Sequence, residues 1–220
     1  MSLPLLLVDE LKGFYKSKVM VSLWIGLPLI SILFRFLSTG TGQAIPFTVI
    51  SSLVVSSLGG TLASVMLAVS IVNEKNRHVY ELFLIRPVKR RNIILAKFLA
   101  VYSCIAIASF LAIILAMTVD FLTRGALPET VLSDTAQSLS ISLSMMAVSS
   151  AVGVLIGVAS PSVLVGAILV IYGGNQISVI PLLPNLLNIT NPALFTICLG
   201  ALMSTVLLTV AISAFNRKQF

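Results

Sequence analysis

Long gaps between charged residues constrain the fold of this chain more than any other feature. No Asp, Glu, Lys or Arg occurs in residues 36–73, 98–119 or 136–216, and another apolar run begins at Val19. A helix needs about 20 apolar residues to cross a bilayer, so the three gaps have room for one, one and three spans. The composition is 58% hydrophobic and 10% charged, with mean hydropathy +1.10, whereas soluble domains carry about a quarter charged residues. We therefore exclude a water-soluble fold and predict an all-α polytopic membrane protein.

The predicted elements form one transmembrane domain over residues 1–220. Residues 1–18 alternate apolar and charged side chains at helical spacing, which favours an interfacial amphipathic helix over a frayed terminus. Six spans follow, at about 19–37, 46–72, 93–119, 135–158, 161–180 and 193–215. Three connections stand out: a charged segment (73–92), a polar outer segment (120–134) and an outer broken segment (181–192), whose three prolines prevent one regular helix.

Basic residues gather in a few segments. Twelve of the 14 Lys and Arg lie before the first span, between the second span and the entrance of the third, or after the last, which leaves only Arg35 and Arg124 elsewhere. Since Lys and Arg in short loops set membrane orientation, we expect these segments and both termini in the cytoplasm, with the protein in the cell membrane. An even number of spans satisfies this topology. The net charge of +7 then serves orientation, and no nucleic-acid partner is expected.

Candidates for catalysis or metal binding are few. The sequence has no phosphate-binding loop and no glycine-rich dinucleotide turn, and its one histidine, His78, lies in the charged segment. Cys104 and Cys198 are expected at opposite depths of the membrane, so a disulfide is not expected, and two Cys with one His are too few for a zinc site. We predict no catalytic residue, metal or cofactor on this chain. Asn188 begins a glycosylation pattern that is short and often accidental.

The second predicted span carries a small residue at every fourth position: Ser52, Ser56, Gly60 and Ser64. The fourth span has a similar pair, Gly153 and Gly157. Lipid offers no hydrophobic drive for helix association, so small faces of this kind allow close helix packing. Packing within one subunit is the favoured interpretation. A dimer interface or a substrate pathway is the alternative.

Two adjacent amides, Asn175 and Gln176, follow Gly173 and Gly174 in the fifth predicted span. Amides inside a membrane are costly unless they have hydrogen-bond partners. They either line a cavity or a helix break, or they form simple hydrogen bonds between helices. Both are therefore candidates for the dimer contact or the substrate pathway.

The most distinctive segment, residues 74–97, reads EKNRHVYELFLIRPVKRRNIILAK. Val79, Leu82, Phe83 and Arg86 follow the spacing of one helix face, which predicts a short amphipathic helix that Pro87 ends. The alternative is a basic loop that only fixes topology.

This segment resembles the loop between spans two and three in the membrane subunits of ATP-binding-cassette exporters of the second type (ABC-2). That loop carries a Glu, a short Leu-rich helix, then Pro-Val and a basic residue. Glu74, the run 81–84, Pro87 with Val88, and Arg90 match the pattern, and Lys97 matches a basic residue at the entrance of span three. The dipeptide 78–79 departs from it, because the family often has Gly-Thr there. The likeness extends along the whole chain.

The resemblance implies a permease subunit of an ATP-driven exporter, which pairs with a second permease subunit as a homodimer or heterodimer. ATP and Mg would bind to separate ATPase subunits, so this chain would not itself be an enzyme. The short loop helix would be the coupling helix that enters a groove on the ATPase. The residues expected at this contact are Glu74, Arg77, Val79, Glu81, Leu82, Phe83, Pro87 and Arg90.

The absence of buried charge suggests a hydrophobic or amphipathic substrate exported from the cytoplasm, with spans one, two and five contributing to the dimer and moving during transport. Two other interpretations stay open. One is a haem-exporter-type membrane subunit of cytochrome maturation, which has a similar length and span count. The other is a non-transporting membrane scaffold or assembly factor.

Overall fold

The computed structural model describes residues 3–15, 18–38, 47–77, 90–124, 129–183 and 192–217, and these residues form helices and short turns without a strand. The long helices are α1 (Leu3–Tyr15), α2 (Lys18–Ser38), α3 (Phe47–Asn76), α5 (Arg90–Arg124), α6 (Glu129–Ala159) and α10 (Pro192–Arg217). The short elements are α7 (Val163–Leu169), η1 (Val170–Gly174), α8 (Asn175–Ser178) and η2 (Ile180–Leu182). The predicted all-α fold is confirmed.

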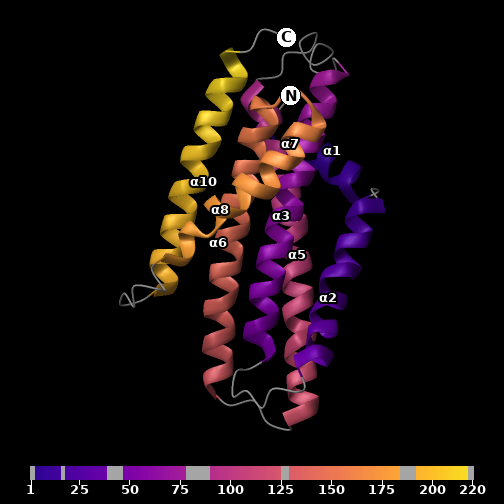
Figure 1. Cartoon of the computed structure of the whole chain (residues 1–220), viewed down its shortest axis with the longest axis vertical. Coiled ribbons are helices and arrows are strands. Elements are labelled where there is room, and N and C mark those ends of the chain that lie inside the picture. Colours follow the sequence, from indigo (N-terminus) through magenta and orange to yellow (C-terminus); the bar gives the residue numbers. More distant parts are fainter. Residues whose placement is uncertain are drawn as a thin grey trace.

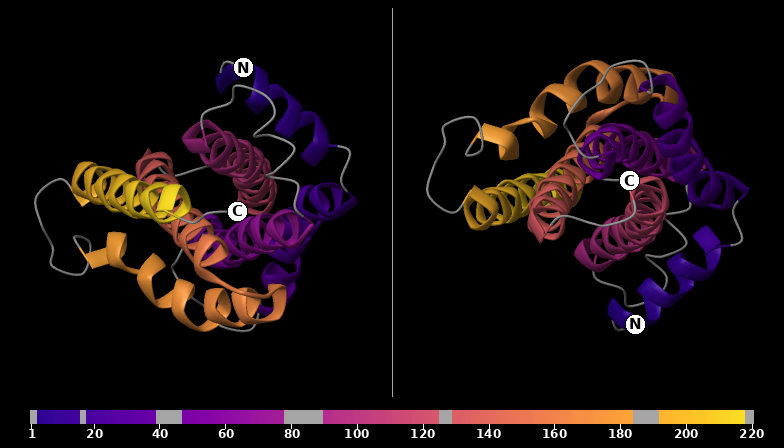
Figure 2. Two further views of the ribbon diagram at one scale, coloured as in Figure 1. Left: turned by 90° about the horizontal axis from the view of Figure 1, so that it is seen from above. Right: turned by 90° about the horizontal axis from the view of Figure 1, so that it is seen from below.

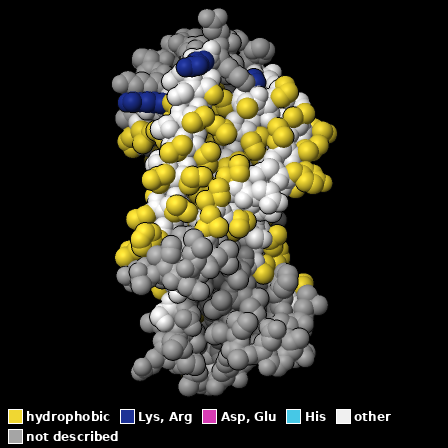
Figure 3. Space-filling model, turned by 60° about the vertical axis from the view of Figure 1, so that its left-hand side comes forward, with side chains coloured by type: hydrophobic (Ala, Val, Ile, Leu, Met, Phe, Trp, Pro, Cys, Tyr) yellow, Lys and Arg dark blue, Asp and Glu magenta, His cyan; other side chains and the backbone are white. Residues whose placement is uncertain are grey.

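The helices form an elongated bundle (Figure 1). Helices α3, α5 and α6 run along its length, with α2 beside α5 and α10 beside α6. At the upper end of Figure 1, α3 and α10 end and α5 begins. Lys75, Arg77, Arg91 and Arg217 belong to these helix ends, and we call this the basic end. Figure 3 shows one face, on which hydrophobic side chains cover the middle and Lys and Arg side chains lie near the upper end.

Four of the described helices are long and apolar enough to cross a membrane: Val54–Asn76, Arg91–Val119, Thr135–Ala159 and Ala193–Arg217. They coincide with the second, third, fourth and sixth predicted spans. The first predicted span forms the helix α2 within one residue of the expected bounds, but its crossing of the membrane stays a prediction. The chain is therefore an integral membrane protein.

The fifth predicted span is not one regular helix. Helix α7 begins after Pro161, with the Ser162 hydroxyl accepting a hydrogen bond from the backbone N–H of Val165. After seven residues it widens into the π-helix η1, which ends on Gly173 and Gly174. Glycine disfavours helix, and π-turns inside helices mark irregular and often functional positions. The chain nevertheless stays helical from Val163 to Ser178, so the irregularity at these glycines is a π-helical segment and not an interruption. We call α7–η1–α8 the broken helix because its hydrogen-bond pattern changes twice.

Two helices extend into the segment 120–134, which the sequence marked as a polar outer segment. Helix α5 continues to Arg124 and α6 begins at Glu129. Within 120–134 only Gly125 and Pro128 oppose helix formation, so polarity alone does not end the helices. Residues 125–128 lie outside the described part of the chain.

Helix α1 confirms the predicted N-terminal helix. It lies beside α5, on the opposite side of the bundle from α7 and α8 (Figure 2). Leu6 is buried, and Leu11 and Phe14 pack against the cores formed by α2, α3 and α5, while Leu5 and Val8 are exposed. One apolar face therefore holds α1 on the bundle and another is free for lipid.

Candidate functional site

A buried lysine holds three helices together near the basic end. Lys97 of α5 is only 2% exposed. Its Nζ lies 2.8 Å from Oε1 of Glu10 on α1 and 2.5 Å from Oε1 of Glu74 on α3. An isolated ammonium is very costly to bury, and these two carboxylates supply the compensating charge. The three side chains fix α1 and the end of α3 to α5.

Glu74 was expected to contact an ATPase subunit, but the structure directs it inward. Its side chain is three-quarters buried, and Oε1 accepts hydrogen bonds from Lys97 and, at 3.4 Å, from the Ser70 hydroxyl. The other oxygen, Oε2, is buried and has no hydrogen-bond partner among the described residues. A glutamate at a helix end can look solvent-facing in sequence, yet the ion pair with Lys97 brings it inside.

Lys75, next to Glu74, reaches a different part of the molecule. Its Nζ donates a hydrogen bond of 3.1 Å to the backbone carbonyl of Ser160, in the turn between α6 and α7. The start of α7 also packs directly on this region, because a Cβ on Gly166 would lie 3.7 Å from Val72 of α3. The end of α3 thus contacts the start of the broken fifth helix.

Most of the predicted ATPase contact lies outside the described residues. This applies to Val79, Glu81, Leu82, Phe83 and Pro87, because the description ends at residue 77 and resumes at 90. Arg77 is exposed at the end of α3, and Arg90 is the first residue of α5. The coupling helix itself therefore stays a prediction.

The small-residue face of α3 packs inside the subunit. Ser56 and Ser64 are 2% and 1% exposed, and Gly60 is buried. Gly60 faces Ser149 of α6, whose hydroxyl donates a buried 2.7 Å hydrogen bond to the Gly60 carbonyl. Helix α6 occupies this face, so these three positions are not free to contact a second subunit, and internal packing, the interpretation favoured from the sequence, is what the structure shows. Ser52 lies on α3, but its side chain is outside the described set.

The glycine pair of α6 is the other half of this contact. A Cβ on Gly153 would lie 2.5 Å from both Cα and O of Ser64, and one on Gly157 would lie 3.0 Å from Cα of Ala68. These are backbone atoms, which cannot rotate away as a side chain can. We call the contact formed by these residues with Gly60 and Ser149 the α3–α6 seam.

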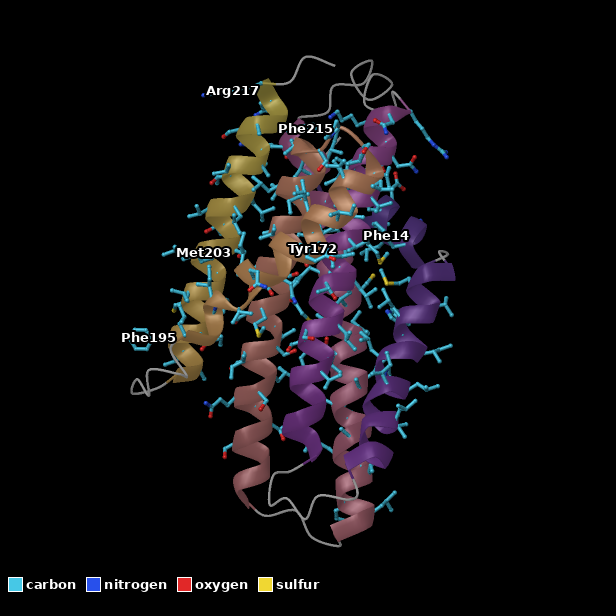
Figure 4. The ribbon with its side chains drawn as sticks, in the orientation of Figure 1. Phe14, Tyr172, Phe195, Met203, Phe215 and Arg217 are labelled. Carbon is cyan, nitrogen blue, oxygen red and sulfur yellow. The ribbon has the colours of Figure 1, made fainter. Side chains whose placement is uncertain are left out.

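The two amides lie on the outside of the broken helix. Asn175 and Gln176 are exposed in α8, as is Gly173 in η1. Tyr172, labelled in Figure 4, is 75% exposed beside them. On the inner side, Gly174 is buried against Val152 of α6.

Possible metal ligands do not cluster in the ranges that the structure describes. Within those ranges no group of three or more His, Cys, Asp or Glu could hold a metal ion. Cys104 and Cys198 are both free, the first buried and the second exposed.

Sequence reasoning missed the partners of Lys97 and Lys75. The partners of Lys97 could have been inferred, because Lys97 stands between two apolar stretches, 93–96 and 98–101. A lysine in such surroundings needs a carboxylate to balance its charge. Of seven acidic residues in the chain, Glu10 and Glu74 were placed near the same membrane surface. No comparable signal exists for Lys75, since its partner is a backbone carbonyl.

Comparison with protein families gave a match over most of the chain. A family described as ABC-2 family transporter protein matches residues 11–216, which is nearly the whole chain. No protein of curated function matched. The match begins within α1 and ends one residue before the end of α10, so it covers the described helices except for the first part of α1.

Proposed function

Because this chain belongs to the ABC-2 family of transporter membrane proteins, we propose that it is the permease subunit of an ATP-driven exporter. ATP and Mg bind to a separate ATPase subunit, since this sequence has no phosphate-binding loop. The observation that carries the proposal is the family match over residues 11–216. The segment 74–97, with its Glu, Leu-rich stretch and Pro-Val, supports it independently.

We propose six spans, with α2 and the broken element α7–η1–α8 added to the four apolar helices. Helix α2 has 21 residues and exposes an apolar stripe at every fourth position: Val21, Ile25, Leu29 and Leu33. The residues 163–178 are apolar and surface-exposed at many positions. A broken helix is tolerated at membrane depth where neighbouring protein satisfies its backbone.

The basic end is the cytoplasmic end in this proposal, with both termini inside the cell. Twelve of 14 basic residues belong to the segments assigned there, and such bias sets orientation. A cysteine replacing Lys89 should resist a membrane-impermeant thiol reagent in intact cells, whereas one replacing Arg124 should react. Reaction at position 89 with protection at 124 would reverse the topology.

The coupling helix was predicted over residues 74–86, but α3 continues to Asn76. In this proposal residues 78–86 therefore act as the coupling helix. Helix α3 ends and α5 begins at the basic end, so the segment that joins them is available to a soluble ATPase. Val79, Leu82 and Phe83 give it an apolar side suited to a groove, and Glu81 and Arg77 supply charge for orientation. ATP-driven movement of the ATPase then passes to the membrane helices.

A second permease subunit completes the pathway, and its contact uses α2 and α7–η1–α8 rather than the small-residue face of α3. Both elements expose apolar side chains, and the second also exposes Asn175 and Gln176. Amides at a subunit contact find polar partners that lipid does not offer. The substrate is hydrophobic or amphipathic, because the described spans place no unpaired charge between helices.

Purification of the tagged chain from its native membrane tests the proposal. An ABC-type ATPase should co-purify, and its ATP turnover in vesicles should depend on this chain. A non-transporting scaffold would instead be purified with other membrane proteins and without such an ATPase. Absence of the ATPase after mild cross-linking would refute the exporter assignment.

A further inference from the structure

Two adjacent residues at the end of α3 reach opposite sides of the bundle. Glu74 contacts Lys97, which also holds Glu10 of α1, whereas Lys75 contacts the Ser160 carbonyl at the start of α7. The side chains of neighbouring residues on a helix point about 100° apart, so the end of one helix can contact elements on two sides of the bundle. Figure 2 shows that α1 and α7 lie on opposite sides of the bundle.

We propose that Glu74 and Lys75 are positioning residues that transmit movement of the 78–89 segment to α1 through Lys97 and to the broken helix α7–η1–α8 through Ser160. The inference rests on the proposed function, because it assumes that an ATPase acts on this segment. It adds which residues carry the movement into the membrane and which two elements receive it.

We call the contacts of Lys97 with Glu74 and Glu10 the α1 branch, and the contact of Lys75 with Ser160 the α7 branch. In the α1 branch, α1 can separate without leaving a buried charge unpaired. Removing the sole partner of a buried ion is strongly destabilising, but Lys97 has two carboxylates. If Glu10 moves away with α1, Glu74 stays on Lys97, and its buried Oε2, which has no partner among the described residues, is available as a second acceptor. Helix α1 has only 13 residues, so its separation from the bundle breaks few contacts.

The α7 branch ends on the element with the least regular backbone. Lys75 fixes the carbonyl that immediately precedes Pro161, and α7 runs from there into the π-helix η1. A charge-assisted hydrogen bond to a backbone group is stronger than a neutral one. Movement of Lys75 therefore shifts the start of α7, and the π-helix with its two glycines can absorb the change.

Hydrogen–deuterium exchange of the purified permease, without ATPase, tests each branch separately. Glu10→Gln should speed exchange in residues 3–15 about tenfold, and Lys75→Met should do so in residues 160–169, as expected for loss of one charged hydrogen bond. Each variant should leave the other region unchanged. Lys75→Arg should restore the wild-type rate, because a guanidinium can donate to the same carbonyl. Arg91→Met, which removes an exposed basic residue at the same end, is the control and should change neither region.

The same measurement on the complex with the co-purified ATPase tests transmission. Adding ATP, Mg and vanadate should change exchange of the wild type in both residues 3–15 and residues 160–169. In Lys75→Met only residues 3–15 should respond. In Glu10→Gln only residues 160–169 should respond. Wild-type exchange at 160–169 in Lys75→Met, with or without the ATPase, would overturn the inference. If no ATPase associates, the proposed function is wrong. The measurement on the permease alone then still shows whether the Glu10–Lys97 and Lys75–Ser160 contacts hold α1 and α7 in place.

Discussion

The α3–α6 seam and the broken helix α7–η1–α8 are in contact with each other, yet they differ in how closely they are packed and in how much of their surface is exposed. In the seam, Gly153 is packed so closely against Ser64 that not even a methyl group fits. In the broken helix, Gly173 has nothing within 4 Å of its would-be Cβ, and Tyr172 is 75% exposed. Close packing transmits displacement without yielding, whereas an irregular, exposed helix can change shape. The seam therefore serves as scaffold, and the broken helix is the element that can move or meet a partner.

Gly153→Ala should have the largest effect on this comparison. The new Cβ would lie 2.5 Å from backbone atoms of Ser64, and overpacking of this kind costs about 3 kcal/mol. Thermal unfolding in detergent, followed by circular dichroism, should show a clear drop in Tm. Gly26→Ala is the matched control, because nothing lies within 4 Å of that glycine in α2, and alanine there should raise the Tm slightly. Equal Tm values for wild type and Gly153→Ala would mean that the seam is not close-packed.

Lys97→Met should have the next largest effect. It removes the cation that pairs with both Glu10 and Glu74 and leaves two carboxylates facing each other. Breaking a buried pair costs 3–5 kcal/mol, and since both carboxylates are about a quarter exposed, we expect about 2–3 kcal/mol. The Tm in detergent should fall, and proteolysis within α1 should accelerate. A triple variant that also carries Glu10→Gln and Glu74→Gln should recover much of the Tm; failure to recover would assign the loss to packing rather than charge.

Replacing both amides of the broken helix, Asn175→Leu with Gln176→Leu, should act on association and not on the fold. Both side chains are exposed in the subunit, so its Tm should change little, whereas polar contacts between membrane helices contribute about 1–2 kcal/mol. Dimers in detergent, measured by light scattering, should weaken about tenfold. Gly60→Leu is the informative contrast, since it should lower the Tm through the seam. Weaker dimers in Gly60→Leu at unchanged Tm would reverse the two assignments.

Replacing either of two neighbouring serines of α6 should have the smallest effect on stability. Ser149→Ala removes the 2.7 Å hydrogen bond to the Gly60 carbonyl and should cost about 0.6 kcal/mol. Ser150 is fully buried, and its hydroxyl has no partner among the described residues, so Ser150→Ala should be neutral or slightly stabilising. Differential scanning fluorimetry of both variants in one detergent would show the order. A larger loss for Ser150→Ala would indicate a partner for that hydroxyl.

The sequence predicted much of this fold because charge and hydropathy act along the chain. Gaps between charged residues located the four apolar helices, and the spacing of small residues identified both faces of the seam, Ser56 to Ser64 and Gly153 with Gly157. Helix ends within 120–134 were missed, since polar residues tolerate helix and only Gly125 and Pro128 oppose it. The inward direction of Glu74 and the contact of Lys75 were also missed, because they depend on how helices pack.

We offer Phe83→Ala as the decisive test of whether this permease receives its movement through the predicted coupling helix. A segment this short is not stable alone in water, so Phe83 is expected to bind in a groove of the ATPase. Burial of such a side chain contributes about 1.5–3 kcal/mol, equivalent to tenfold to a hundredfold in affinity. The measurement is ATP turnover of the ATPase in vesicles, titrated against wild-type permease and against Phe83→Ala. The variant should fold and dimerise normally, but about tenfold to a hundredfold more of it should be needed to stimulate turnover. Equal stimulation at equal concentrations would contradict it.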